Sequence, residues 1–420
     1  MPIIRNKKLV PDNQLQALFD EFESASTVVE NGLSFHSIRE TAYLEEILPD
    51  AFTVKPTIPR SAAINIFRKA LFKARRDGPL TAQSIIDRAQ QINHNDRSVP
   101  FNNFALWTKI RSFGMNNHPS LTFKWGDVSI RLVSELPKWL RLEPFKNSEL
   151  GIIDPNEPKG SGYVILSCQE RLEKDAVDKM LSALSLFMSL MNIYETRGSW
   201  TIMSGRNWTA GQLRMGPYQF LYKNRKFSGP DRIWYEPSYS EKSWSSQIPG
   251  FDKYFKISGL VRKALRALEA HPLKQILTSS LQLAQDAFEA RDGNHRLMRF
   301  WSALEKIYVE DWARDKSNQK VIERATFADE NYKLSEWQLS HIARLRNEHV
   351  HSRGHEDMFM EQSQILRSIL TRHILHWIFR GSDFKNHESL LAYVDLPRED
   401  GALKAMKRII DRRIKLNQLA

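Results

Sequence analysis

The hydrophobic pattern changes near residue 250, and this change most limits the folds open to the chain. Beyond it, apolar residues recur at the three- and four-residue spacing of amphipathic helices. Six segments show this pattern: residues 255–268, 272–290, 294–312, 334–351, 356–380 and 401–416. A polar gap at residues 313–332 separates the third segment from the fourth. Since the connections between these helices are short, the pattern predicts a mostly antiparallel helical bundle.

The first 250 residues mix strand and helix patterns. Residues 121–133 alternate apolar and polar side chains around a Trp-Gly-Asp turn, which is typical of a β-hairpin. A further strand is expected at residues 162–168, and a long helix at residues 170–194. Strands interleaved with helices indicate an α/β or α+β region, whose strand order the sequence does not reveal.

We therefore expect an α+β protein in two parts. Residues 1–250 would form an N-terminal mixed α/β region of unknown fold, with room for two subdomains, that senses or recruits. Residues 251–420 would form an all-α antiparallel bundle. The boundary is expected at Pro249-Gly250, because such dipeptides mark turns and linkers.

The chain is basic, with 61 Lys and Arg against 49 Asp and Glu and a net charge of +12. This excess favours a polyanionic partner such as nucleic acid. Two stretches are open to the same interpretation: a basic amphipathic helix at residues 60–76, and aromatics interleaved with basic residues at 196–250. Both patterns arise more often from packed core elements with a solvated face, which is the interpretation that we favour.

Several function classes are disfavoured by what the sequence lacks. The single cysteine, Cys168, excludes an internal disulfide framework and any cysteine-based zinc site. The chain has neither a His-Glu-x-x-His pattern nor a Walker loop, so we expect no metal and no cofactor. It shows no secretory signal, and its apolar stretch at residues 183–193 is short for a membrane span. We expect a cytoplasmic protein with no membrane partner.

Residues 346–351 read Arg-Asn-Glu-His-Val-His near the end of an expected helix. Arginine offers a fixed fork of donors to phosphate oxygens, and histidine gives and takes protons near neutral pH. Together they can carry out acid–base chemistry beside a phosphate without a metal. On an ideal helix Asn347 and His351 share a face about 40° apart, whereas Arg346 lies about 140° from His351.

The helical part resembles a HEPN domain of the Apea-like group over roughly residues 255–385. Arg346, Asn347 and His351 fit the family's Arg-Asn-x-x-x-His signature. Residues 295–305 look like the helix that precedes the motif helix in that group. Residues 1–250 resemble no family that we can name.

The resemblance implies a metal-independent endoribonuclease that cleaves RNA by transphosphorylation and acts as a toxin or an anti-phage defence effector. His351 would be the general acid/base, and Arg346 would hold the scissile phosphate and stabilise charge developing on it. Asn347 would orient His351 or the phosphate. Glu305 is expected either to point into the site as a further catalytic residue or to lie on a plain polar surface.

Other assignments within the motif remain open. Arg344 and Arg353 are candidate substrate-binding residues. Arg344 and His349 have the same spacing as Arg346 and His351, and could replace them as the catalytic pair. The motif could also be a solvated helix end, where cations favour the C-terminal dipole.

The resemblance also implies partners. The expected partners are RNA, with tRNA as one candidate, and a second copy of the chain bound through the helical domain to form a shared cleft. The N-terminal region, a partner protein such as an antitoxin, or the dimer geometry would restrain the enzyme until a trigger, for example a phage-derived one, releases it. The rival function is a non-catalytic RNA- or protein-binding module of the same fold. A DNA-binding regulator is a poorer fit, because no helix-turn-helix with a clear recognition helix stands out.

Overall fold

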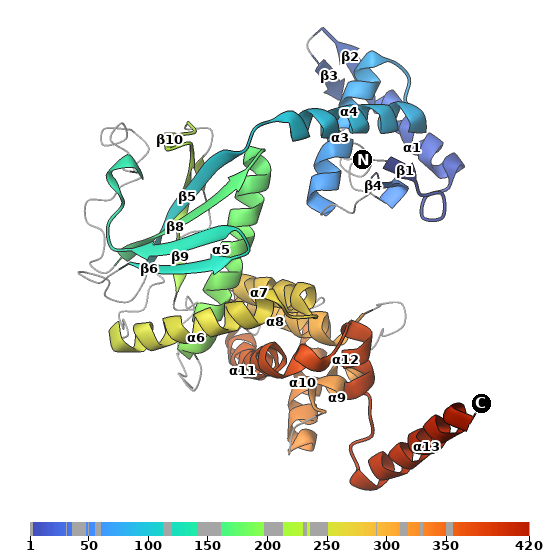
Figure 1. Cartoon of the computed structure of the whole chain (residues 1–420), viewed down its shortest axis with the longest axis vertical. Coiled ribbons are helices and arrows are strands. Elements are labelled where there is room, and N and C mark those ends of the chain that lie inside the picture. Colours follow the sequence, from blue (N-terminus) through green and yellow to red (C-terminus); the bar gives the residue numbers. More distant parts are fainter. Residues whose placement is uncertain are drawn as a thin grey trace. The chain divides into compact units, whose positions relative to one another are not determined.

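The computed structural model describes most of the chain and has the predicted α+β architecture (Figure 1). The described residues are 3–30, 32–35, 48, 50–54, 60–111, 120–140, 161–196, 213–229, 233–235, 251–290, 292–310, 318–327, 331–349 and 356–419. The chain divides into two compact units, Met1–Asn102 with Gln169–Ala176, and Asn103–Cys168 with Val177–Ala420.

The first unit packs helices against two small antiparallel sheets, in which β1 pairs with β4 and β2 with β3. Its elements are β1 (Ile3–Arg5), α1 (Asp12–Ala25), β2 (Ser26–Val29), β3 (Gly32–Phe35), β4 (Phe52–Val54), α3 (Arg60–Asp77) and α4 (Ala82–Ser98). The α3 residues Phe67 and Leu71 are fully buried, and the Phe67 ring stacks on Phe52 with centroids 5.3 Å apart. The basic helix predicted at residues 60–76 is therefore a core helix.

The second unit contains a seven-stranded sheet. Its strands are β5 (Asn102–Arg111), β6 (Leu121–Trp125), β7 (Val128–Val133), β8 (Ser161–Glu170), β9 (Arg214–Lys223), β10 (Lys226–Phe227) and β11 (Ile233–Tyr235). Their order is β10-β9-β5-β8-β7-β6, and β11 also pairs with β9. The predicted hairpin is confirmed as β6–β7, with Gly126 at a φ of +57° in its turn.

Aromatic side chains fill both faces of this sheet. On one face Trp107 of β5 stacks on Phe220 of β9, with ring centroids 4.3 Å apart. Tyr222 is buried on the same face, so the described aromatics of β9 pack in a core. The base-stacking interpretation also included Trp200 and Trp244, and these two residues lie outside the described residues.

The opposite face of the sheet packs against the long helix α5 (Glu173–Thr196) (Figure 1). Phe123 of β6 contacts Phe187 of α5, with ring centroids 4.8 Å apart. Among the described helices, α5 alone is long and apolar enough to cross a membrane. Most of its apolar stretch is buried inside the fold, however, which is the environment of a core helix.

The C-terminal part is entirely helical in the described residues. Its helices are α6 (Phe251–Glu269), α7 (Lys274–Glu289), α8 (Gly293–Tyr308), α9 (Asn318–Ala325), α10 (Tyr332–His349), α11 (Glu356–Arg380), α12 (His387–Val394) and α13 (Asp400–Leu419). Helix α8 packs along both α7 and α11, whereas the described side chains of α13 face solvent. The polar gap predicted at residues 313–332 is wrong in part, because α9 lies within it. The buried apolar side chains of α9 are Val321, Ile322 and Ala325.

A buried amide connects the sheet region to the helices. Asn192 of α5 donates to the Leu213 carbonyl and to Gln285 of α7, both at 3.2 Å, and accepts from the Leu213 N–H at 2.9 Å. The compact unit therefore extends across the boundary expected at Pro249-Gly250. That dipeptide lies outside the described residues, so the boundary itself stays a prediction.

Replacement of Asn192 by alanine should lower the free energy of unfolding by about 2–4 kcal/mol, because it leaves the buried Leu213 N–H and the Gln285 carbonyl without this partner. Denaturant unfolding of the full chain measures the change. Asn95→Ala, which removes an exposed amide from α4, serves as the control. A loss for Asn192→Ala no larger than that of the control would contradict the structural role of this network.

Candidate functional site

The candidate motif lies in the last turns of α10. Leu339, Ile342 and Leu345 on the helix are buried, and this face anchors α10 to its neighbours α8, α9 and α11. With this face of α10 turned inward, Arg346 is part-buried and Asn347 is exposed. His351 and Arg353 lie outside the described residues, as does the side chain of His349, so their predicted roles stay predictions.

Arg346 is held by a buried carboxylate. Its Nη1 lies 3.1 Å from Oε1 of Glu305 on α8, and the side chains of Arg346 and Glu305 are 21% and 6% exposed. The Trp301 indole N–H donates to the same carboxylate oxygen, one helical turn before Glu305. The Arg346 guanidinium also lies over the Trp301 ring, 5.8 Å from its centroid. Glu305 therefore points toward the motif helix, and the plain-surface interpretation of it is wrong.

Burial controls the protonation of Glu305. It raises the pKa of the Glu305 carboxyl above its ordinary value, and the Arg346 guanidinium and the Trp301 N–H offset only part of this effect. Arg346 is therefore the partner that favours an ionised Glu305 in surroundings that disfavour charge. Because Glu305 is nearly inaccessible, its carboxylate contacts Arg346 and Trp301 and is shielded from solvent.

Asn318 of α9 joins the two motif residues on α10. Its Oδ1 accepts from Arg346 Nη1 at 3.0 Å, and its Nδ2 lies 3.5 Å from Oδ1 of Asn347. Asn318 was not among the residues predicted from the sequence, because it lies in the stretch taken as a polar gap. The spacing of the apolar residues Val321, Ile322 and Ala325 could have indicated a helix there.

Helix α9 is itself fixed by an arginine. Arg324 donates to both carboxylate oxygens of Asp395 at 2.9 Å, and to the Tyr308 carbonyl oxygen at the end of α8 at 2.6 Å. Burial alone would raise the pKa of Asp395, but hydrogen bonds from Arg324 and Lys320 outweigh it and hold the pKa below its ordinary value. These contacts place Asn318 opposite α10.

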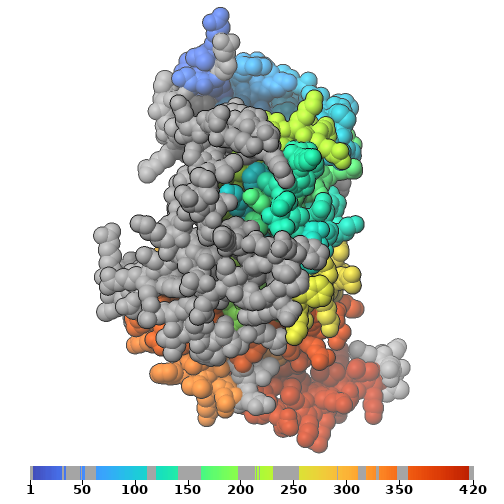
Figure 2. Space-filling model, turned by 90° about the vertical axis from the view of Figure 1, so that its left-hand side faces the viewer, coloured from blue at the N-terminus to red at the C-terminus, as the bar shows by residue number. Residues whose placement is uncertain are grey.

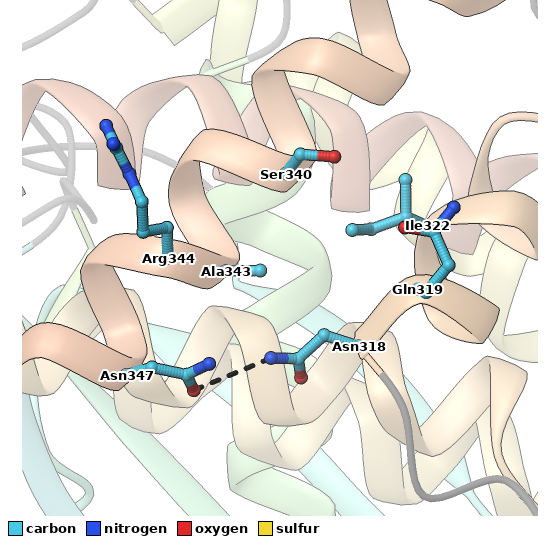
Figure 3. Close-up of a pocket in the computed structure, with 7 residues that line it drawn as sticks. All are labelled: Asn318, Gln319, Ile322, Ser340, Ala343, Arg344 and Asn347. Carbon is cyan, nitrogen blue, oxygen red and sulfur yellow. Dashed lines mark hydrogen bonds between the residues drawn. The ribbon is translucent and has the colours of Figure 1, made fainter.

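An open pocket of about 560 Å³ lies between α9 and α10. Figure 3 shows its lining residues, which are Asn318, Gln319 and Ile322 from α9 and Ser340, Ala343, Arg344 and Asn347 from α10. Ile322 and Ala343 are buried and form the apolar part of the pocket lining, while the other lining side chains are polar. In the space-filling view, orange atoms of this part of the chain reach the surface on the face shown (Figure 2).

Arg344 occupies a different position from Arg346. It is exposed at the edge of the pocket, and its guanidinium points away from Asn318 (Figure 3). Its Nη2 lies 3.1 Å from Nδ1 of His341. Arg344 thus lines the pocket, and its role as a substrate-binding residue stays a prediction.

The surroundings limit the chemistry of other groups. His373 is buried in the bundle, where its Nδ1 lies 2.7 Å from the Tyr308 hydroxyl. The described residues include no group of three or more His, Cys, Asp or Glu that could hold a metal ion. The pocket is lined by the Arg344 guanidinium and by the amides of Asn318 and Asn347, and Arg346 donates to Asn318 beside it. These groups suit an anionic, hydrogen-bonding ligand.

Because its pKa is raised, Glu305 should make the stability of the fold depend on pH in a definite direction. The folded state holds the Glu305 proton to higher pH than the unfolded chain, so wild-type stability should fall as pH rises above the ordinary glutamate pKa of 4.5 and through the raised value. Glu305→Gln has no such proton and should lack this fall. Thermal unfolding across this range measures the difference between the two proteins.

Glu361→Gln, which changes an exposed glutamate on α11, is the control and should follow the wild type. If wild type instead gains stability over Glu305→Gln as pH rises, the Arg346 ion pair outweighs burial, and folding lowers the pKa of Glu305 instead of raising it.

Comparison of the chain with family models, curated proteins and solved structures finds no significant match. The resemblance to HEPN domains therefore stays a prediction that rests on the residues of the two helices α8 and α10.

Proposed function

We propose that this chain is a metal-independent endoribonuclease that cleaves RNA by transphosphorylation at the site formed by α8, α9 and α10. The observation that carries the proposal is the contact between buried Glu305 and Arg346 at 3.1 Å, which fixes an arginine of the Arg-Asn-x-x-x-His motif. Asn318 extends this arrangement to Asn347 at the rim of an open pocket. A guanidinium held in place before the substrate arrives needs little reorganisation to bind a phosphate.

The proposed reaction needs one proton to move twice. The RNA 2′-oxygen attacks the adjacent phosphorus while His351 takes the proton of the 2′-hydroxyl. The bond from phosphorus to the 5′-oxygen then breaks, and His351 returns the proton to that oxygen. The products are a 2′,3′-cyclic phosphate and a free 5′-hydroxyl. Arg346 stabilises the charge on the phosphorane, and Asn347 orients His351 or the phosphate.

The proposal includes a biological setting that follows from the family resemblance. The enzyme would act in the cytoplasm, on tRNA or other RNA, as a toxin or an effector of anti-phage defence. A homodimer through the helical domain would bring two motifs to one cleft. Because such an enzyme would damage its own cell, the N-terminal region, an antitoxin or the need for a phage-derived trigger would restrain it.

A non-catalytic module is the rival function. The contacts of Arg346 with Glu305 and Asn318 also hold α8, α9 and α10 together, so they would be useful to a protein that only binds RNA or another protein. The basic net charge of +12 suits RNA binding with or without cleavage.

The first test is cleavage of total RNA and tRNA by the purified full chain in EDTA. Wild type should release fragments with 2′,3′-cyclic phosphate ends, and His351→Ala should reduce the rate by roughly 10²- to 10⁴-fold, the usual contribution of a general acid–base group. His349→Ala is the matched variant within the motif and should retain activity.

Loss of activity in His349→Ala but not in His351→Ala would reassign the catalytic pair to Arg344 and His349. Equal activity in all three proteins would exclude both histidines. If wild type binds RNA but does not cut it, even with its natural trigger, the non-catalytic module is the better account.

Asn318→Ala tests the positioning role of α9. It should lower kcat by roughly 10- to 100-fold with little change in KM, because it frees Arg346 and Asn347 without removing either from the site. Gln319→Ala is the control, since Gln319 lines the same pocket from the same helix without bridging the motif residues. Equal effects of the two substitutions on kcat would show that Asn318 has no special role.

A further inference from the structure

Trp337 of α10 has an unusual environment for a tryptophan. It is 68% exposed, whereas Trp139 is 39% exposed and Trp107, Trp301 and Trp377 are at most 3% exposed in the same protein. A large aromatic ring in water forgoes the stabilisation that burial gives, and tryptophan is enriched at interfaces. Trp337 is therefore a candidate contact for a ligand.

Trp337 belongs to a row of flat groups along α10. Its ring lies nearly parallel to that of His341, at 13° with centroids 6.2 Å apart. The Nδ1 atom of His341 in turn lies 3.1 Å from Nη2 of Arg344. Since these residues are four and three apart, they share one stripe of the helix. We call Trp337, His341 and Arg344 the α10 stack.

The α10 stack leads to the candidate active site. Arg344, its last member, lines the pocket that also contains Asn318 and Asn347. About 10 Å of helix separates Trp337 from Arg344, at a rise of about 1.5 Å per residue. A ligand that lies along the stack would therefore reach the pocket at the motif end of α10.

We infer that the α10 stack binds unpaired nucleotides of single-stranded RNA, with a base stacked on Trp337 and a phosphate near Arg344. The inference rests on the proposed function for the identity of the nucleic acid, and it adds that the substrate is unpaired. Aromatic rings beside cations are the usual means of holding single strands, because every base has a face that can stack. Bases inside a duplex already stack on one another and present only their edges.

A second copy of the chain fits this surface less well. Besides Trp337, the exposed large apolar side chains of α10 among the described residues are Tyr332 and Leu334. The Arg398 guanidinium covers the Tyr332 ring, 4.6 Å from its centroid. The apolar area left is small beside the roughly 800 Å² that each partner buries in a stable interface. The Arg344 guanidinium of the stack suits a polyanion better.

The test measures RNA binding by the full chain carrying His351→Ala, so that bound RNA is not cut. The probe is a short fluorescein-labelled oligoribonucleotide of mixed sequence, used as a single strand, as a duplex and as a strand with abasic sites. In this background Trp337→Ala should weaken binding of the single strand by roughly tenfold or more, the effect of losing one base stack. Trp337→Phe, which keeps a flat ring, should restore most of the affinity.

Trp139→Ala is the matched control, since it removes another exposed indole that lies away from α10, in the 3-10 helix η1 (Lys138–Leu140). It should bind the single strand as the background protein does. The duplex and the abasic strand should bind more weakly than the single strand, and Trp337→Ala should change their binding little. Sedimentation of Trp337→Ala should give the same mass as the background protein.

Three results would overturn the inference: equal binding of the single strand with and without Trp337, equal binding of the abasic and intact strands, or a loss of self-association in Trp337→Ala without a loss of RNA binding. The last would assign the face to a second copy. Failure of the nuclease proposal is separate, because it would appear as RNA binding that depends on Trp337 in a wild-type chain that never cleaves.

Discussion

The ion pair between Glu305 and Arg346 is the contact on which the rest of the site depends. A carboxylate with a side chain 6% exposed is expensive to ionise unless a partner and hydrogen bonds compensate. Arg346 supplies the charge and Trp301 supplies a hydrogen bond to the same oxygen. The partly exposed guanidinium is thus held by buried side chains of α8, whereas an isolated surface arginine has no such buried partners. This arrangement separates Arg346 from the many solvated cations of a chain with a net charge of +12.

The fold supports this pair through rigid neighbours. Helix α8 buries Phe300, Leu304 and Tyr308 around Glu305, so the carboxylate comes from a core helix with little freedom. Helix α9 has only eight residues and would be unstable alone, yet the bond from Arg324 to Asp395 holds it in place. The site is therefore built by two fixed helices that meet the last turns of α10, and its pocket opens between α9 and α10.

Long amphipathic elements could be predicted from the sequence, and short or polar ones could not. The pattern of residues 334–351 predicted α10, and the alternation around Gly126 predicted the hairpin, because each stretch has enough apolar positions to show its period. Helix α9 was missed, since eight residues give barely two turns of pattern. Without a predicted α9, the position of Asn318 beside the motif could not be predicted either. The sequence does not reveal which way the Glu305 side chain points, because the spacing of residues on a helix does not say which neighbouring helix a polar residue faces.

The central claim is that Arg346 and its motif act on a phosphate that a neighbouring 2′-hydroxyl attacks. The most direct measurement maps one cleavage site in an RNA and then replaces the nucleotide on the 5′ side of that bond by its 2′-deoxy counterpart. If the 2′-hydroxyl is the nucleophile, cleavage should disappear at this bond and continue at other sites of the same molecule. Continued cleavage at the 2′-deoxy position would mean that water or another nucleophile attacks the phosphate, and would contradict transphosphorylation.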